Sequence, residues 1–352
     1  MSAGLDAVAA PAAQVDRRLA EVLDEEAARW ADLHPSLAGP LEAVRRMVLS
    51  GGKRLRPAFC YWGFLGAGGR PDDPLVIDAG AALELLHAFA LLHDDVMDGA
   101  STRRRLPTIH VEWEERHRRG AWRGDPRRFG EGVAILMGDL AHVYADRLLR
   151  HAPADAHDVW HELRIEVNIG QLLDLTGAAV GDTDPRTARL IARYKSGRYT
   201  IERPLHLGAA LAGLGRLAAL REAFSAYGDP LGQAFQLRDD VLGAFGDESL
   251  TGKPVGDDLR EGKATLLLAI ASQRADAGQA RTLAQVGSPR LGPAEIGALQ
   301  EVLEATGARD ELEREIERLT AEAIAALDRT PAPEQVRAAL AEIAVSLAAR
   351  RS

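Results

Sequence analysis

Apolar residues recur every three or four positions along most of the chain, with charged residues between them. This spacing is typical of amphipathic α-helices. The sequence has no convincing series of alternating strand patterns, and long polar loops are expected at 101–130 and 246–263. We therefore predict an all-α protein with helices from Val15 onward and around 41–50, 75–98, 131–150, 158–176, 186–213, 217–245, 263–275, 294–304, 309–327 and 334–347.

The domain organisation follows from the same pattern. Residues 1–15 are rich in Ala, Gly and Pro, and we expect them to be a loose N-terminal segment. No linker separates two helical regions after that point, so residues 16–352 are predicted to form a single large helical bundle. With 46% hydrophobic and 27% charged residues, the chain has enough apolar surface to build a core, which excludes a mainly disordered protein.

The net charge and the cysteine content limit the possible binding partners and the cellular compartment. The net charge of −9 argues against nucleic acid as the main partner, because phosphate contacts need a basic face. The single cysteine, Cys60, cannot form an internal disulfide, which fits a reducing cytoplasm. We expect no secretory signal, because Asp6 is acidic and no basic residues precede the short apolar stretch, and no membrane span, because no uncharged apolar run reaches about 18 residues.

Two acidic segments end strongly apolar helices. Asp94 and Asp98 are four residues apart, so they project from one helix face, where like charges repel. They also lie near the helix C-terminus, the unfavourable end for negative charge. A compensating cation is therefore expected, and oxygen ligands suit Mg²⁺. Asp239 and Asp240 again form a pair of aspartates after an apolar helical stretch, about 145 residues later, where they could face the first segment across a cavity.

Basic residues accompany both acidic segments, and a diphosphate ligand would need such positive side chains as well as a metal. Lys53 and Arg56 follow the glycine break at 50–52, Lys195 precedes Ser196, and Lys253 and Lys263 lie in the polar loop 246–263. Each of these basic residues, taken alone, is more typical of a solvent-exposed surface charge. Together with the acidic segments they predict a site for metal and diphosphate.

The order of these motifs resembles that of the trans-isoprenyl diphosphate synthases, also called polyprenyl synthetases, and most of all the geranylgeranyl diphosphate synthases. The resemblance runs over roughly residues 40–270. It implies an all-α helical bundle of the isoprenoid synthase type around a central cavity, usually homodimeric, that condenses isopentenyl diphosphate with an allylic diphosphate. The matching segments are Gly51–Pro57, Asp94–Arg104, Gly170–Asp174, Lys195–Ser196 and Phe235–Asp240.

The resemblance also implies a role for each matching residue. Asp94 and Asp98 would hold two Mg²⁺ ions and Asp239 a third. Carboxylates and an amide that act through water would be Asp95, Gln171, Asp174 and Asp240. Residues that grip the allylic diphosphate would be Arg103, Lys195, Ser196 and Lys253. Residues that bind isopentenyl diphosphate would be Lys53, Arg56, His87 and Arg104. Gln236 would lie near the reacting carbons, and Lys263 would close the loop over the site.

Two positions depart from the family pattern. Ser196 stands where Thr is usual and keeps the hydroxyl. Gly243 stands where many members have the third Asp of the second motif, and we expect Asp247 to help through water. The spacing of Asp239, Gly243 and Asp247 also resembles that of class I terpene cyclases. A cyclase and an inactive partner subunit of a synthase are therefore kept as alternatives.

The product length is read from the helix that carries Asp94. Phe89 lies five residues upstream, an axial drop of about 7.5 Å, and would form the floor of the chain-length cavity with the small Ala90. In the resemblance, one aromatic residue at this position favours the C20 product, geranylgeranyl diphosphate. Farnesyl diphosphate (C15) and longer products stay open as alternatives.

Overall fold

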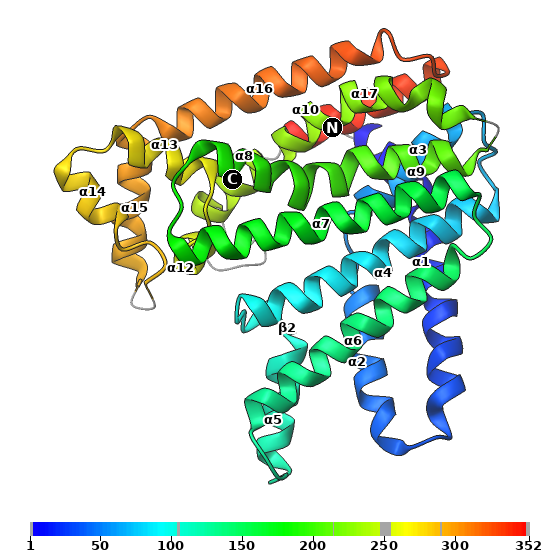
Figure 1. The fold of residues 1–352 in the computed structure, drawn as a ribbon, viewed down its shortest axis with the longest axis horizontal. Coiled ribbons are helices and arrows are strands. Elements are labelled where there is room, and N and C mark those ends of the chain that lie inside the picture. The colour runs from blue at the N-terminus through cyan, green and yellow to red at the C-terminus, as the bar shows by residue number, and fades with distance from the viewer. Residues whose placement is uncertain (1–2, 104–105, 214, 247–254, 289–290, 350–352) are drawn as a thin grey trace.

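The computed structural model describes residues 3–103, 106–213, 215–246, 255–288 and 291–349, and its long helices run side by side in a bundle (Figure 1). The long helices that line or support the site are α3 (Leu55–Gly66), α4 (Pro74–Met97), α6 (Pro126–Leu148), α7 (Ala154–Val180) and α10 (Arg216–Phe245). The other elements are α1 (Ala3–Ala31), η1 (Pro35–Leu37), α2 (Ala38–Leu49), β1 (Thr102–Arg103), β2 (Leu106–Pro107), α5 (Ile109–Arg119), α8 (Pro185–Ile191), the π-helix η2 (Ala192–Glu202), α9 (Arg203–Leu211), α12 (Asp257–Glu261), α13 (Leu266–Arg274), α14 (Ala277–Leu283), α15 (Pro293–Ala305), α16 (Ala308–Leu327) and α17 (Glu334–Ala348).

The prediction of an all-α fold is confirmed. Within the described ranges the strands are limited to β1 and β2, which pair antiparallel in a short hairpin. The expectation of a polar loop over 101–130 is wrong, because this stretch contains the hairpin, all of α5 and the start of α6. Ile109, Trp113 and His117 are spaced four apart and buried on one face of α5, while arginines occupy its exposed face and hide the helical pattern.

The prediction of a loose segment over residues 1–15 is wrong for residues 3–15, which form the first turns of α1. Val15 and Leu19 are fully buried and anchor this helix to the core. Pro11 lies inside α1 and has no N–H to donate to the carbonyl of Ala7. The indole Nε1 of Trp62 donates to that carbonyl instead, at 2.8 Å, so α3 supplies the bond that proline removes.

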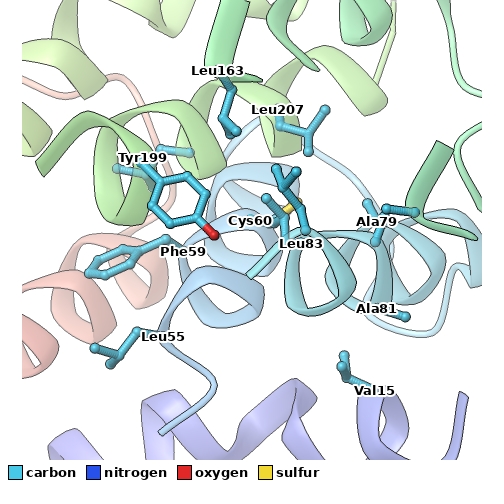
Figure 2. Packing of buried hydrophobic residues seen from close by; sticks show 14 of the residues in the cluster. Val15, Leu55, Phe59, Cys60, Ala79, Ala81, Leu83, Leu163, Tyr199 and Leu207 are labelled. Carbon is cyan, nitrogen blue, oxygen red and sulfur yellow. The ribbon is translucent and has the colours of Figure 1, made fainter. Parts of the chain in front are cut away.

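The main core joins helices from both ends of the chain. Figure 2 shows Cys60 of α3 beside Leu83 of α4 and Leu207 of α9, with Val15 of α1 below them. Burial raises the pKa of the Cys60 thiol. A second cluster of buried residues joins α10 to α13, α15 and α16. The cavity described below is lined mainly from α4, α7, η2 and α10.

Helix α4 is long and apolar enough to cross a membrane by length and composition alone. The most hydrophobic window of this helix is 61% buried inside the protein, and α4 packs on α3 and α6. Its hydropathy is therefore that of a core helix. Because the last turn of α4 carries Asp94 and Asp95, this buried helix also delivers the first acidic segment to the interior.

The π-helix η2 is held by unusually close helix contacts. A Cβ on Gly170 of α7 would lie 2.3 Å from the backbone nitrogen of Lys195, and a Cβ on Gly232 of α10 would lie 2.6 Å from Cα of Gly197. Only glycine permits these backbones to approach so closely. The two contacts clamp η2 between α7 and α10, which fixes the position of Lys195.

Candidate active site

A cavity of about 610 Å³ lies between α4, α7, η2 and α10. Its walls combine two chemical characters. Lys195 contacts the carboxylates of Asp94 and Asp174, and apolar side chains that include Phe89 and Leu91 of α4 also line the cavity. The predicted site residues that line it are Lys53, Arg56, His87, Phe89, Ala90, Asp94, Gln171, Asp174, Lys195, Ser196, Gln236, Asp239, Asp240 and Lys263.

The first acidic segment closes helix α4. Oδ1 of Asp94 accepts from Nε2 of Gln171 at 3.1 Å and from Nζ of Lys195 at 3.3 Å. Burial alone would raise the pKa of Asp94, but the nearby cations, led by Lys195, hold it below its usual value. Burial and repulsion from Asp94 raise the pKa of Asp98 to about 6. The two carboxylates thus differ in how much compensating positive charge they have.

Asp95 points away from the main cavity and is buried. Its Oδ1 accepts from Nε of Arg103 at 2.7 Å, and a guanidinium nitrogen of Arg103 also lies 3.5 Å from Oδ2 of Asp94. Burial raises the pKa of Asp95 despite this ion pair. Arg103 and Asp95 line a smaller cavity of about 60 Å³ beside α2 and β2. Arg103 therefore binds both Asp94 and Asp95 from the side of the smaller cavity and fixes the position of the first acidic segment.

The second acidic segment closes helix α10, on the opposite wall. Asp239 lines the cavity together with Asp240, whose Oδ1 accepts from Nε2 of Gln236 at 2.7 Å. Burial, with added repulsion from Asp258 and Asp239, raises the pKa of Asp240 to about 8. The raised pKa therefore reflects mainly the burial of Asp240, with a smaller contribution from the neighbouring carboxylates.

Lys195 and Lys263 connect the acidic groups of different elements. Nζ of Lys195 lies 3.3 Å from Asp94 and 2.5 Å from Asp174, so it joins α4 to α7. Nζ of Lys263 lies 3.7 Å from Asp98 and 3.4 Å from Asp258, so it joins the first acidic segment to α12. Burial alone would lower the pKa of Lys263, but the surrounding carboxylates raise it well above its usual value. Both ammonium groups are therefore charged inside the site.

The basic side chains near α3 form a separate corner of the cavity. Arg56 stacks its guanidinium 4.3 Å over the ring of Tyr199 and donates to Oγ1 of Thr200 at 3.0 Å. Lys53 and His87 line the same cavity, and the ring of His87 lies 6.3 Å from that of Tyr199. These contacts orient Arg56 beside the histidine, as a binding site for a second anion requires.

The apolar part of the cavity contains Phe89. Its ring stacks on His142 of α6, with centroids 4.7 Å apart, and lies 4.6 Å from the ring of His93. Nη1 of Arg164 lies 3.1 Å from Nε2 of His142 and also contacts Asp146. The Phe89 ring is thus backed by a polar network that joins α6 and α7.

Three residues named from the sequence lie outside the described residues, namely Arg104, Lys253 and Asp247. Other participants were missed from the sequence. Tyr199 and Asp258 line the cavity, and Arg54 is a buried ion-pair partner beside it. Asp258 could have been found from the spacing of acids before Lys263. Arg54 could not, because adjacent basic residues look alike in sequence.

The donor set suits a metal that is completed by phosphate oxygens. Within the ranges that the structure describes, no group of three or more acidic, His or Cys side chains could hold a metal by itself. Carboxyl groups from two walls nevertheless lie in one largely buried site, where burial and mutual repulsion raise the pKa of Asp98 and of Asp240, so a bound cation would stabilise their ionised forms. Mg²⁺ commonly binds through one or two carboxylates together with substrate phosphates. The residues therefore fit Mg²⁺ bound with a diphosphate.

The fold and the site together define an all-α enzyme for diphosphates that carry a hydrocarbon chain. Residues 40–305 match the family model of polyprenyl synthetases, and the chain belongs to this family. It is a trans-prenyl diphosphate synthase, which confirms the resemblance seen in the sequence.

Known relatives in this family differ in product. The structure of a geranylgeranyl pyrophosphate synthase from Corynebacterium glutamicum, complexed with isoprenyl diphosphate and magnesium, superposes with a TM-score of 0.91 and 40% identity, covering 97% of this chain and 99% of that one. A geranylfarnesyl diphosphate synthase from Aeropyrum pernix is 31% identical, covering 82% of this chain and 87% of its own. A (2E,6E)-farnesyl diphosphate synthase from Mycobacterium bovis is 32% identical, covering 83% and 78%.

Proposed function

We propose that the protein condenses isopentenyl diphosphate with an allylic diphosphate to make geranylgeranyl diphosphate, with Mg²⁺ as cofactor. The observation that carries this proposal is one cavity whose lining combines carboxylates and lysines with apolar side chains that include Phe89. Phe89 and Asp94 lie on the same helix, five residues apart, so diphosphate and hydrocarbon chain can align with α4. The 40% identity to a geranylgeranyl pyrophosphate synthase supports the C20 product.

In this proposal Asp94, Asp98 and Asp239 hold up to three Mg²⁺ ions with the allylic diphosphate. The ions supply positive charge that stabilises the leaving diphosphate. Asp95, Gln171, Asp174 and Asp240 orient these carboxylates or act through water. Gln171 already donates to Asp94, and Lys195 ties Asp94 to Asp174.

The side chains of this chain then assist each step of the reaction. Lys195, Ser196 and Lys253 grip the allylic diphosphate while its C–O bond breaks and the bonding electrons leave with the diphosphate. Arg103, for which the resemblance implies the same role, instead holds Asp94 and Asp95 from outside the main cavity. Lys53, Arg56, His87 and Arg104 hold isopentenyl diphosphate so that its double bond attacks the allylic carbocation. The departing diphosphate accepts the proton that is then lost. Gln236 lies near the reacting carbons, and Lys263 closes the loop and helps to exclude water.

We also propose that the enzyme is a homodimer and works in the cytoplasm. Large apolar side chains are exposed along one side of α6 and α7, where water would be an unfavourable neighbour. These side chains are Ile135, Leu136, Val143, Ile165, Ile169, Leu172 and Leu175. Ile165→Glu should lower the mass measured by light scattering from dimer to monomer, whereas Val345→Glu on α17, equally apolar and exposed, should leave it unchanged. A wild-type monomer would contradict the proposal.

The function is tested by incubating the purified chain with isopentenyl diphosphate, Mg²⁺ and each allylic starter in turn, with products resolved by chain length. We expect a C20 product that disappears when EDTA removes the metal. A C15 product would refute the assigned length and leave the reaction intact. A hydrocarbon or alcohol formed from geranylgeranyl diphosphate alone would refute the synthase itself.

A further inference from the structure

Two arginines at the end of the π-helix η2 bind the same carboxylate on α7. Arg198 lies within η2, and Arg203 begins α9 directly after it. Nη1 of Arg198 donates to Oε1 of Glu166, and Arg203 donates to both oxygens of that carboxylate through Nε and Nη2, each at 2.8 Å. Glu166 and Arg203 are buried, and only 18% of the Arg198 side chain is exposed. Glu166 is thus a shared acceptor for two elements that follow one another in the chain.

The winding of the backbone decides whether both arginines can reach Glu166. In a regular α-helix each residue turns by about 100°, so side chains five residues apart point about 140° away from each other. In a π-helix residues i and i+5 are joined by a backbone hydrogen bond, so they lie almost above one another. The backbone N–H of Arg203 donates to the carbonyl oxygen of Arg198, which is such a bond. The shared ion pair therefore fits the π form and would be broken in a regular α-helix.

The charges in this network depend on one another because they are buried. Burial alone would raise the pKa of Glu166, but Arg203 and Arg198 hold it below its usual value. Nε of Arg198 also lies 3.1 Å from Oε2 of Glu202, and Nη2 of Arg203 lies 2.9 Å from Oε1 of Glu162. Loss of one partner would leave another charge buried without compensation, which is unfavourable. The network therefore favours the winding that keeps all of its ion pairs.

Lys195 lies at the other end of the same contact between η2 and α7. It is three residues before Arg198, and its ammonium group contacts Asp94 and Asp174 in the cavity. Asp174 follows Glu166 by eight residues on α7, about 12 Å along the helix axis, so α7 binds η2 at two separate levels. Each residue of a π-helix turns less than a residue of an α-helix. A change of winding would therefore rotate Lys195 relative to α7 and take it away from both aspartates.

We propose that Glu166, together with Arg198 and Arg203, keeps η2 in its π form and thereby positions Lys195 for the allylic diphosphate. The inference rests on the proposed function, because it needs Lys195 to bind diphosphate. None of the three side chains of the network lines the main cavity, so they are positioning residues. The close glycine contacts set the distance between η2 and its neighbours, whereas this network sets its winding.

The test measures how Glu166 and Lys195 are coupled, by calorimetric binding of inorganic diphosphate with Mn²⁺ as the probe cation. Glu166→Gln keeps the shape of the side chain and removes its charge, and should weaken binding about tenfold; Lys195→Ala should have a similar effect. Because the first change acts through Lys195, the double variant should bind at most about twofold more weakly than Lys195→Ala alone. A merely structural effect of Glu166 would instead add to that of Lys195.

Two further variants separate positioning from folding, with thermal midpoints to show that each protein is folded. Arg198→Met leaves Glu166 paired with Arg203, so the buried charges stay compensated. It should show the same loss of diphosphate binding even if Glu166→Gln folds poorly. Glu162→Gln is the matched control on α7, because its carboxylate also pairs with Arg203 but has its other partner, Arg221, on α10. It should bind diphosphate as the wild type does.

Three results would overturn the inference. They are wild-type binding by Arg198→Met, a loss in Glu166→Gln that adds fully to that of Lys195→Ala, or an equal loss in Glu162→Gln. A failure of the proposed function looks different, because the wild type itself would then show no Mn²⁺-dependent binding of diphosphate and no turnover. Wild-type binding by Lys195→Ala would contradict the role proposed for that lysine.

Discussion

Replacing Glu84 by Ala should destabilise the protein and weaken the binding of isopentenyl diphosphate more than that of the allylic substrate. Arg54 precedes α3 with a left-handed backbone (φ 47°), an unfavourable conformation for a residue with a side chain. Nη1 of Arg54 donates to Oε2 of Glu84 on α4 at 2.5 Å, and the two side chains are only 5% and 6% exposed. The pair holds the turn that carries Lys53 on one side and Arg56 on the other.

The magnitude follows from burial. Removing one partner of a buried ion pair costs about 3–5 kcal/mol, because the other charge stays buried without compensation. Arg54 keeps two acceptors, Oδ1 of Asp16 at 2.8 Å and the carbonyl of Val48 at 2.9 Å. We therefore expect a loss near the lower end, about 3 kcal/mol, in the free energy of unfolding. The KM for isopentenyl diphosphate should rise, because Lys53 and Arg56 lie on the turn that the Arg54–Glu84 pair holds. The KM for the allylic substrate should change little, because Lys195, which is proposed to bind it, lies on a different element, η2.

Urea unfolding followed by circular dichroism, together with steady-state kinetics, measures both effects. Glu25→Ala, an exposed carboxylate on α1, is the control and should stay within about 0.5 kcal/mol of the wild type. Arg54→Met combined with Glu84→Leu should regain most of the stability, since well-packed apolar residues can replace a buried pair. A loss below about 1 kcal/mol for Glu84→Ala, or an equal rise in both KM values, would refute the reasoning.

Three further predictions concern the floor, the buried histidine and the helix clamp. Phe89→Ala should lengthen the product in a chain-length assay, and an unchanged distribution would remove Phe89 from the floor. Burial lowers the pKa of His206 to about 3, so between pH 6.5 and 3 only the unfolded chain takes up its proton. Stability should then fall by about 1.4 kcal/mol per pH unit below 6.5, and His206→Asn should show a shallower slope in urea unfolding at pH 5 to 7. Gly170→Ala should lower activity several-fold and lower the thermal midpoint, because its Cβ would meet the Lys195 backbone. Gly132→Ala on α6, which has open space around it, is the control and should be neutral or slightly stabilising. Equal effects at the two glycines would contradict the close packing of η2 against α7.

Much of the architecture could be predicted because helical periodicity is a local property. The spacing of apolar residues predicts the long helices and places Asp94 in the last turn of an apolar helix, as it is in α4. It failed at α5, where arginines surround a narrow buried face, and at the turns of α1 before Val15, where Ala7 is buried and its carbonyl accepts from Trp62 of α3. In both cases the helix is stabilised by what it packs against, which a single segment cannot reveal.

The site was predictable as a list of residues but not as a set of contacts. Each of Asp94, Lys195 and Asp239 was named from its motif, and all three line one cavity. That Lys195 bridges Asp94 and Asp174 depends on a π-helix pressed against α7, and no local pattern signals that extra residue per turn. The division between Arg54, which is buried with Glu84, and Arg56, which lines the cavity, likewise depends on tertiary packing.

The segment around Gly243 shows why a missing motif residue is weak evidence for a missing function. A motif read along one helix assumes that every ligand comes from that helix at fixed spacing. A binding site requires only that an oxygen atom stands at the right point, and any element can deliver it. Asp258 of α12 already places a carboxyl group beside Gly243, so the lack of an acid at position 243 does not leave this side of the cavity without one. The distinction between a synthase and a cyclase therefore has to be drawn at the basic corner around Lys53 and Arg56, where a second diphosphate can bind, and not at position 243.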